Sequence, residues 1–348
     1  MKYFLFALVA LLLLSCKKDK DPEVTAPASL SGGFLVLHEG LFQHNNASLW
    51  WVPADGATPT TDFFEQKANR SLGDTGNDMQ RYGNKIYIVV NVSSTIEVLN
   101  ASTGASVGHI SMIDGSTPKQ PRYITFHGSH AYVSCYDGFV DVIDTASLSV
   151  VQRIPVGANP EHLVVSNNKL FVANSGGLNF PNVDSTISVI SLASHSEITR
   201  ITVGPNPGKV CVDVFGNVYA VSRGDYAAIP AKLHRIDQQN NIKTATYSFE
   251  IDDVVPYNNG LMIFRNNTGI QGFAFDPLTE QCSSSPTIQF NGITTYYGAK
   301  YRSSNASWYV FDANGYTMNG FVKQFDGNSN LVRNYQVGLN PTSILFYD

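Results

Sequence analysis

A strand-like segment that recurs seven times along the 348 residues constrains the fold more than any other feature of this sequence. Within a copy, apolar and polar residues alternate, as at residues 140–144, which is the two-residue period of a β-strand. The seven copies end at Pro53, Asn100, Asp144, Ser191, Asp237, Asp276 and Asp326, 39 to 50 residues apart. A repeat of about 40 to 50 residues with four short strands is typical of β-propellers. We therefore expect an all-β, seven-bladed β-propeller with four antiparallel strands per blade.

The two ends of the repeat region predict how the ring closes. Residues 33–37 have the pattern of a second strand, and residues 341–347 have the pattern of a first strand. We expect these N- and C-terminal strands to share the closing blade of a propeller domain that covers residues 32–348. Such a closure leaves no unpaired strand at the seam of the ring.

A shared turn, Val-Gly-x-Asn-Pro, precedes several first strands. It occurs at residues 156–160, 203–207 and 337–341. Glycine adopts positive φ more readily than any other residue, and proline fixes φ near −65°. We expect positive φ at Gly157, Gly204 and Gly338, and we assign these turns a structural role.

Residues 1–15 have the features of a secretory signal, with a basic start and a short apolar run. That run is shorter than the ~20 residues needed to span a bilayer. The segment Leu-Leu-Ser-Cys at residues 13–16 resembles the lipobox of bacterial lipoproteins. The resemblance implies that Cys16 is lipidated and that residues 16–31 form a flexible tether to a membrane. An ordinary signal peptide with an incidental cysteine is the alternative.

Composition excludes some classes of protein. The chain is 43% apolar and 15% charged, which is typical of a folded domain with a large core. A net charge of −5 gives no electrostatic footprint for nucleic acid. Cys135, Cys211 and Cys282 have no disulfide or zinc spacing, and we interpret the first two as small buried apolar residues.

The sequence offers little for catalysis. Residues 104–108 fit G-x-S-x-G, but no helix follows, as a nucleophile elbow requires. The eight histidines have no metal-ligand spacing. Asp252 and Asp253 precede a first strand and either face the central channel or are solvated turn residues, the interpretation we favour. We predict no catalytic residue, no metal and no cofactor.

One face of the predicted propeller is rich in aromatic, amide and guanidinium groups. It is formed by the loops between second and third strands and by those that lead into first strands. The candidate ligand-binding residues are Phe42, Asn46, Asp78, Arg122, Tyr123, Tyr136, Asn174, Phe180, Arg223, Tyr226, Arg265 and Tyr297. Such groups suit a large, polar, uncharged or zwitterionic ligand, or a protein partner. The alternative is that these are merely solvated loop residues.

The strand motifs add a family resemblance. Ile-Tyr-Ile-Val-Val-Asn at 86–91, Leu-Phe-Val-Ala-Asn at 170–174 and the Val-Gly-x-Asn-Pro turns are similar to the YVTN repeats of YncE-like propellers. Residues 69–78 resemble a segment of Bacteroidetes lipoproteins of this type, some of which are surface cobalamin-binding proteins. This resemblance implies an outer-membrane lipoprotein, facing the cell exterior, that captures a nutrient such as cobalamin for a TonB-dependent outer-membrane transporter.

Two other functions stay open. A propeller hydrolase or lyase would need a metal in the channel, with Asn77, Asp78 or Asp252 as candidate ligands. A structural or adhesive surface protein would need neither a metal nor a small-molecule ligand.

Overall fold

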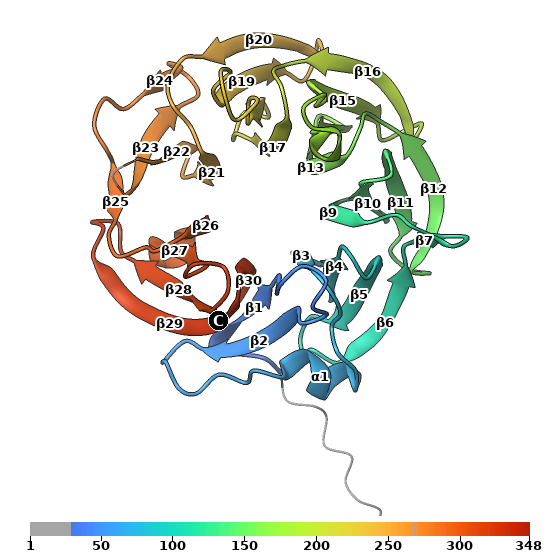
Figure 1. Ribbon diagram of the computed structural model, residues 1–348, viewed down its shortest axis with the longest axis vertical. Coiled ribbons are helices and arrows are strands. Elements are labelled where there is room, and N and C mark those ends of the chain that lie inside the picture. Colours follow the sequence, from blue (N-terminus) through green and yellow to red (C-terminus); the bar gives the residue numbers. More distant parts are fainter. Residues whose placement is uncertain (1–28, 268) are drawn as a thin grey trace, which may run out of the picture.

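The computed structural model describes residues 29–267 and 269–348. Within them, seven antiparallel sheets stand as blades around a central axis (Figure 1), which confirms the predicted seven-bladed β-propeller. The predicted signal segment 1–15 and the lipidation site Cys16 lie outside the described residues.

The first four blades, with strands given from the axis outward, follow the chain in order. Blade 1 contains β30 (Pro341–Tyr347), β1 (Gly33–His38) and β2 (Ser48–Pro53). Blade 2 contains β3 (Gly76–Tyr82), β4 (Lys85–Val90), β5 (Thr95–Asn100) and β6 (Ser106–Ser111). Blade 3 contains β9 (Pro121–His127), β10 (His130–Cys135), β11 (Phe139–Asp144) and β12 (Ser149–Pro155). Blade 4 contains β13 (Pro160–Ser166), β14 (Lys169–Asn174), β15 (Thr186–Ser191) and β16 (Ser196–Thr202).

The last three blades complete the ring. Blade 5 contains β17 (Pro207–Val212), β18 (Val218–Ser222), β19 (Lys232–Asp237) and β20 (Ile242–Tyr247). Blade 6 contains β21 (Asp253–Tyr257), β22 (Gly260–Asn266), β23 (Ile270–Asp276) and an outer strand in two pieces, β24 (Gln281–Cys282) and β25 (Ile288–Phe290). Blade 7 contains β26 (Tyr296–Arg302), β27 (Ser307–Asp312), β28 (Asn319–Phe325) and β29 (Leu331–Leu339). The short elements outside the blades are α1 (Phe63–Ala68), β7 (Ile113–Asp114), β8 (Thr117–Pro118) and the 3₁₀ turns Gly177–Asn179 and Ser303–Asn305.

The ends of the third strands agree with the sequence repeat. Six of the predicted positions are the last residues of β2, β5, β11, β15, β19 and β23. The seventh, Asp326, comes one residue after β28. The alternating pattern located these strands because each has one face toward each neighbouring blade.

The apolar core consists of seven clusters, each between two adjacent blades. Tyr132, Val140 and Leu170, for example, pack together between blades 3 and 4. Burying one such side chain contributes about 1.5–3 kcal/mol. Because a single blade cannot cover its own faces, the stability of each blade depends on both neighbours.

Blade 1 closes the ring with strands from both ends of the chain. β1 pairs antiparallel with β30 on its inner side and with β2 on its outer side. Leu35 lies opposite Leu345 in one pair and opposite Trp51 in the other. The shared closing blade predicted from residues 33–37 and 341–347 is therefore present.

The outer edge of blade 1 departs from the regular repeat. In place of a fourth strand, a single bridge joins Trp51 to Thr60, and α1 follows directly. Phe63 and Phe64 of α1 are buried in the cluster between blades 1 and 2, so they supply apolar surface at the edge where the fourth strand is missing. Blades 2, 3, 4, 5 and 7 have four strands each.

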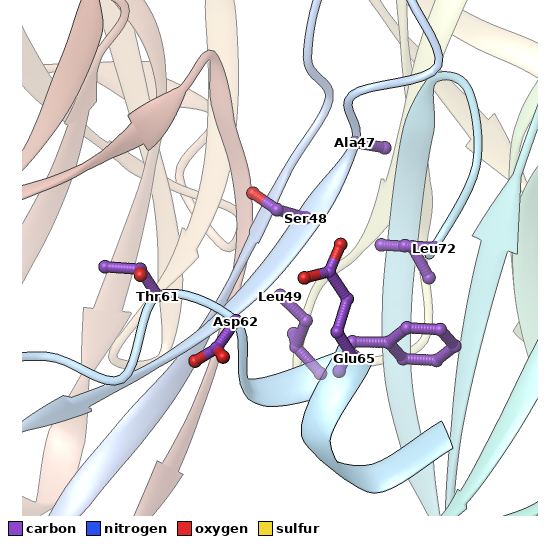
Figure 2. A pocket seen from close by; sticks show the side chains of 8 residues that line it. Ala47, Ser48, Leu49, Thr61, Asp62, Glu65 and Leu72 are labelled. Carbon is purple, nitrogen blue, oxygen red and sulfur yellow. The ribbon is translucent and has the colours of Figure 1, made fainter. Parts of the chain in front are cut away.

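Two hollows flank this irregular edge. A small cleft of about 40 Å³ lies between β2 and α1, where Leu49, Leu72 and Glu65 point toward it (Figure 2). A wider groove of about 640 Å³ lies between β2 and β29, with Trp50 and Tyr335 among its lining residues. Both lie on the side wall of the ring, away from the axis.

The Gly-x-Asn-Pro turns work differently from the prediction. Positive φ occurs at the asparagines Asn159, Asn206 and Asn340, with values of 44°, 55° and 55°, and not at the preceding glycines. Asparagine tolerates this left-handed conformation better than most residues. The glycines are needed for space: a Cβ on Gly338 would lie 2.9 Å from the His38 ring, and one on Gly157 would lie 2.5 Å from Asn174. Close packing of the turn on the second strand is therefore the reason for glycine.

His38, at the end of β1, forms a hydrogen bond to the turn before β30, where the ring closes. The Gly338 N–H donates to Nε2 of His38 at 3.0 Å, so Nδ1 carries the proton and donates to Ser48, whose hydroxyl oxygen lies at 3.1 Å. Burial lowers the pKa of His38 from its ordinary 6.5 to about 3, and the bond to the Ser48 carbonyl opposes this shift. His38 is therefore neutral in the folded protein at pH 7.

This neutral histidine predicts a pH dependence of stability. Because the pKa of His38 is lower folded than unfolded, its stabilising contribution is complete above pH 6.5 and is lost as pH falls toward 3. Between pH 6.5 and 4.5 the loss is at most about 3 kcal/mol. We expect His38→Gln to be less stable at pH 7 but to show a smaller fall over this range in urea unfolding. His109→Gln, at an exposed position on β6, is the control. Equal pH dependence in wild type and His38→Gln would contradict the assignment.

Candidate functional site

The candidate site lies where the inner strands of blades 3, 4 and 5 begin. β9, β13 and β17 each start with a proline, and a bulge follows that first residue. Bulges re-aim side chains and are frequent next to functional sites. The residues directly after these prolines are Arg122, Glu161 and Gly208.

Glu161 is the centre of the cluster. Its Oε2 accepts from Arg122 Nε at 3.1 Å, and its Oε1 accepts from the Tyr136 hydroxyl at 2.6 Å. Arg122 lies over the Tyr136 ring, 4.7 Å from the centroid, and also donates to the Asn77 side chain of blade 2. Three blades therefore fix one carboxylate and one guanidinium in a single geometry.

The electrostatics keep these groups in defined charge states. Burial disfavours the charged form of Arg122, but Glu161 more than compensates, so the pKa of Arg122 lies above its usual value. Burial raises the pKa of Tyr136, with a further contribution from Glu161, so its hydroxyl stays protonated and donates. Burial likewise raises the pKa of Tyr123 to about 12.

Arg223 reaches this cluster from the loop after β18. Its Nη1 lies 3.9 Å from Glu161 Oε1, and 41% of its side chain is exposed. A Cβ on Gly208 would lie 2.3–2.6 Å from the guanidinium of Arg223. The absence of a side chain at Gly208 therefore provides the space that Arg223 occupies.

Two exposed aromatic side chains border the cluster. Phe180, in the loop after β14, is 57% exposed, and Tyr226, in the loop after β18, is 70% exposed. Their ring centroids are 6.4 Å apart. Asn206 donates to the Tyr226 hydroxyl at 3.0 Å, which fixes the position of that ring. Exposed aromatic rings beside charged groups are a common feature of binding surfaces.

Six of the predicted site residues come together here. They are Arg122, Tyr123, Tyr136, Phe180, Arg223 and Tyr226.

The other six predicted residues have different surroundings. Phe42 is exposed on the loop after β1, and Asn46 accepts from Leu41 N–H within that loop. Asn174 is fully buried in blade 4, where it donates to Thr186 and Ser188. Asp78, Arg265 and Tyr297 are likewise engaged by protein partners: the Ile124 N–H, the Phe273 ring and Glu39, respectively.

The two adjacent carboxylates of blade 6 differ from each other. Asp252 is exposed and accepts from Asn266 N–H at 2.7 Å, as we expected for a turn residue. Asp253 instead begins β21 and pairs with Lys209 of blade 5 at 2.5 Å. It also accepts from the Tyr296 hydroxyl. The turn interpretation is therefore wrong for Asp253, which links three inner strands.

Glu161 and Gly208 are not among the site residues predicted from the sequence. Both follow the proline of a first strand, at the position that Arg122 occupies in blade 3. The repeat aligns this position in the three blades, but it does not show which of these residues interact. Their neighbours come from adjacent blades, which the sequence of one repeat does not identify.

The metal-dependent hypothesis offered three candidate ligands, two adjacent residues of β3 in blade 2 and one residue before β21 in blade 6. Asn77 is engaged with Arg122, Asp78 is buried against β9, and Asp252 lies in blade 6. Across residues 29–267 and 269–348, no group of three or more His, Cys, Asp or Glu side chains is arranged to hold a metal ion. In the same residues, no helix has the length and apolar character to cross a membrane.

Residues 32–263 match a family described as "Domain of unknown function (DUF5074)". The chain belongs to this family. The finer resemblance of this DUF5074 protein to YncE-like propellers and cobalamin-binding lipoproteins stays a prediction. No curated protein matches the chain.

Solved structures similar to this DUF5074 protein support the propeller fold. A quinonprotein alcohol dehydrogenase-like protein from Bacteroides thetaiotaomicron has a TM-score of 0.67 and 12% identity, covering 91% of this chain and 79% of its own. Hydrazine synthase from Kuenenia stuttgartiensis has a TM-score of 0.61 and 16% identity, covering 75% of this chain and 86% of its own. At such low identity the likeness concerns the fold alone.

The central position of Glu161 predicts a large cost of its removal. Glu161→Ala would leave the largely buried Arg122 without its carboxylate, so we expect a loss of about 3 kcal/mol in urea unfolding. Glu197→Ala, which breaks a more exposed pair with Arg200, is the matched control and should cost about 0.5 kcal/mol. Equal small losses in both variants would show that the Glu161 cluster is not a tightly held network.

Proposed function

We propose that this protein is a non-enzymatic binding protein that captures a ligand on the face formed by Arg122, Tyr136, Glu161 and Arg223. The observation that carries the proposal is the combination of fixed charged groups with the exposed rings of Phe180 and Tyr226. Burying exposed aromatic surface is a main source of binding energy, and fixed polar groups orient the ligand. A site already held by its own hydrogen bonds loses little entropy on binding.

The proposed ligand is a nutrient, and cobalamin or another corrinoid is the specific candidate. Support comes from the strand motifs and from residues 69–78, which resemble surface cobalamin-binding lipoproteins. In this proposal the protein passes its ligand to a TonB-dependent outer-membrane transporter. The face formed by Arg122, Tyr136, Glu161 and Arg223, the loop face, would then bind first the ligand and afterwards the transporter.

The proposal includes a lipid anchor at Cys16 that holds the protein on the outer membrane, facing the cell exterior. The Leu-Leu-Ser-Cys segment at residues 13–16 supports it. Acyl chains contribute ~0.8 kcal/mol per buried methylene to membrane binding. Palmitate labelling that is equal in wild type and Cys16→Ala would rule out the anchor.

Calorimetric titration with cyanocobalamin tests the proposed function. We expect measurable binding by the wild type, and at least about tenfold weaker binding by Phe180→Ala/Tyr226→Ala, because the exposed rings supply the apolar contact. Phe215→Ala is the matched control: Phe215 is 50% exposed, but it lies in the first loop of blade 5, at the opposite end of the strands. Absence of binding by the wild type would contradict the corrinoid assignment, and an equal loss in Phe215→Ala would contradict the location.

A further inference from the structure

We infer that Arg223 binds an oxyanion of the ligand, a phosphate or a carboxylate, while an apolar ring of the same ligand lies on Phe180 and Tyr226. This inference rests on the proposed binding role of the loop face and names the chemical class of its ligand.

Positive charge exceeds negative charge around Glu161. Two guanidinium groups, Arg122 and Arg223, approach this single carboxylate. Arg122 takes the close contact at 3.1 Å, whereas Arg223 stays at 3.9 Å, beyond hydrogen-bond distance. Glu161 therefore compensates one of the two positive charges well and the other weakly.

The guanidinium of Arg223 has N–H donors that a ligand can use. Among residues 29–267 and 269–348, its guanidinium makes no hydrogen bond to another protein group, although a guanidinium carries five N–H donors. Because 41% of the side chain is exposed, these donors are open to a ligand. The planar fork of arginine matches the two oxygens of a carboxylate or phosphate, and such charge-assisted pairs are strong.

The backbone that carries the Arg223 side chain is held in place by hydrogen bonds. The Arg223 N–H donates to Asn206 O at 2.9 Å, and the Gly224 N–H donates to Pro205 O at 3.1 Å. The carboxylate of Asp225 accepts from the N–H groups of Ala227 and Ile229. The loop therefore presents Arg223 from a defined base, over the space left by Gly208.

The nearby carboxylates are already engaged. Asp225 is used by its own loop, and Asp253 is paired with Lys209 at 2.5 Å. His162, beside Tyr123, is neutral at pH 7, because burial, and then Lys209, lower its pKa to about 4. Among the described residues of this cluster, Arg223 is the cation whose charge is left for a ligand, so an uncharged ligand, one of the two kinds that the sequence suggests, fits this site less well.

The two exposed aromatic rings near Arg223 indicate which group the ligand carries besides its oxyanion. Tyr226 follows Arg223 by three residues in one loop, and the ring centroid of Phe180 lies 6.4 Å from that of Tyr226. Because Tyr226 belongs to the same loop as Arg223, a ring attached to an anionic group held by Arg223 can lie on these exposed aromatic rings. A ligand with both an oxyanion and an apolar ring uses both features.

Calorimetric titrations with phenyl phosphate, benzoate and the neutral benzamide test this inference, in low-salt buffer without phosphate. We expect the two anions to bind with Kd values of about 1 mM or below, and benzamide at least about tenfold more weakly. The order of phenyl phosphate and benzoate shows which oxyanion the site prefers. Binding of benzamide equal to that of the anions, or no binding of either anion, would overturn the inference.

Variants locate the contact. Arg223→Gln should lower the affinity for the anions to that of benzamide, whereas Arg200→Gln, on the outer strand β16, should leave it unchanged. Gly208→Ala keeps the charge but places a Cβ on the guanidinium, so we expect a comparable loss at an unchanged melting temperature. Undiminished anion binding by Arg223→Gln would overturn the inference. Anion binding that depends on Arg223, without cyanocobalamin binding, would sink the corrinoid assignment alone.

Discussion

The pairing of β1 with β30 is the interaction on which the rest of the structure depends. The apolar core is divided into seven clusters, and every cluster needs two blades. A ring that failed to close would expose the facing sides of blades 1 and 7 and lose the burial of the cluster between them. His38 and Gly338 strengthen the same seam, because the N–H of one end of the chain donates to the ring nitrogen of the other.

Closure also determines where chemistry can be assembled. The seven inner strands lie side by side around the axis, so residues far apart in the chain meet at the start of those strands (Figure 1). Glu161 receives Arg122 and Tyr136 from the blade before it, and Arg223 from the blade after it. The bulges behind the first-strand prolines place Arg122 and Glu161, and the loops after β10 and β18 add Tyr136 and Arg223.

The repeat was sufficient to predict the number of blades, the ends of most third strands and the shared closing blade, because strand alternation and period are local properties. Phe180 and Tyr226 could be assigned to one face because they occupy loops after second strands, and Arg122 because it follows the proline that begins a first strand. Glu161 could not, since its importance comes from neighbours in adjacent blades. The turn glycines were assigned the wrong role for a similar reason: the contact of Gly338 with His38 joins residues 300 positions apart. Physical packing between repeats, which periodicity does not describe, accounts for both.

Hydrogen–deuterium exchange with and without saturating cyanocobalamin tests most directly whether the loop face captures a ligand. We expect slower exchange in the loops at residues 175–185 and 223–231, which carry Phe180, Arg223 and Tyr226. We expect unchanged exchange at residues 213–217, the turn at the opposite end of blade 5. Protection confined to that opposite end, or to the side-wall groove between β2 and β29, would show that the ligand binds elsewhere.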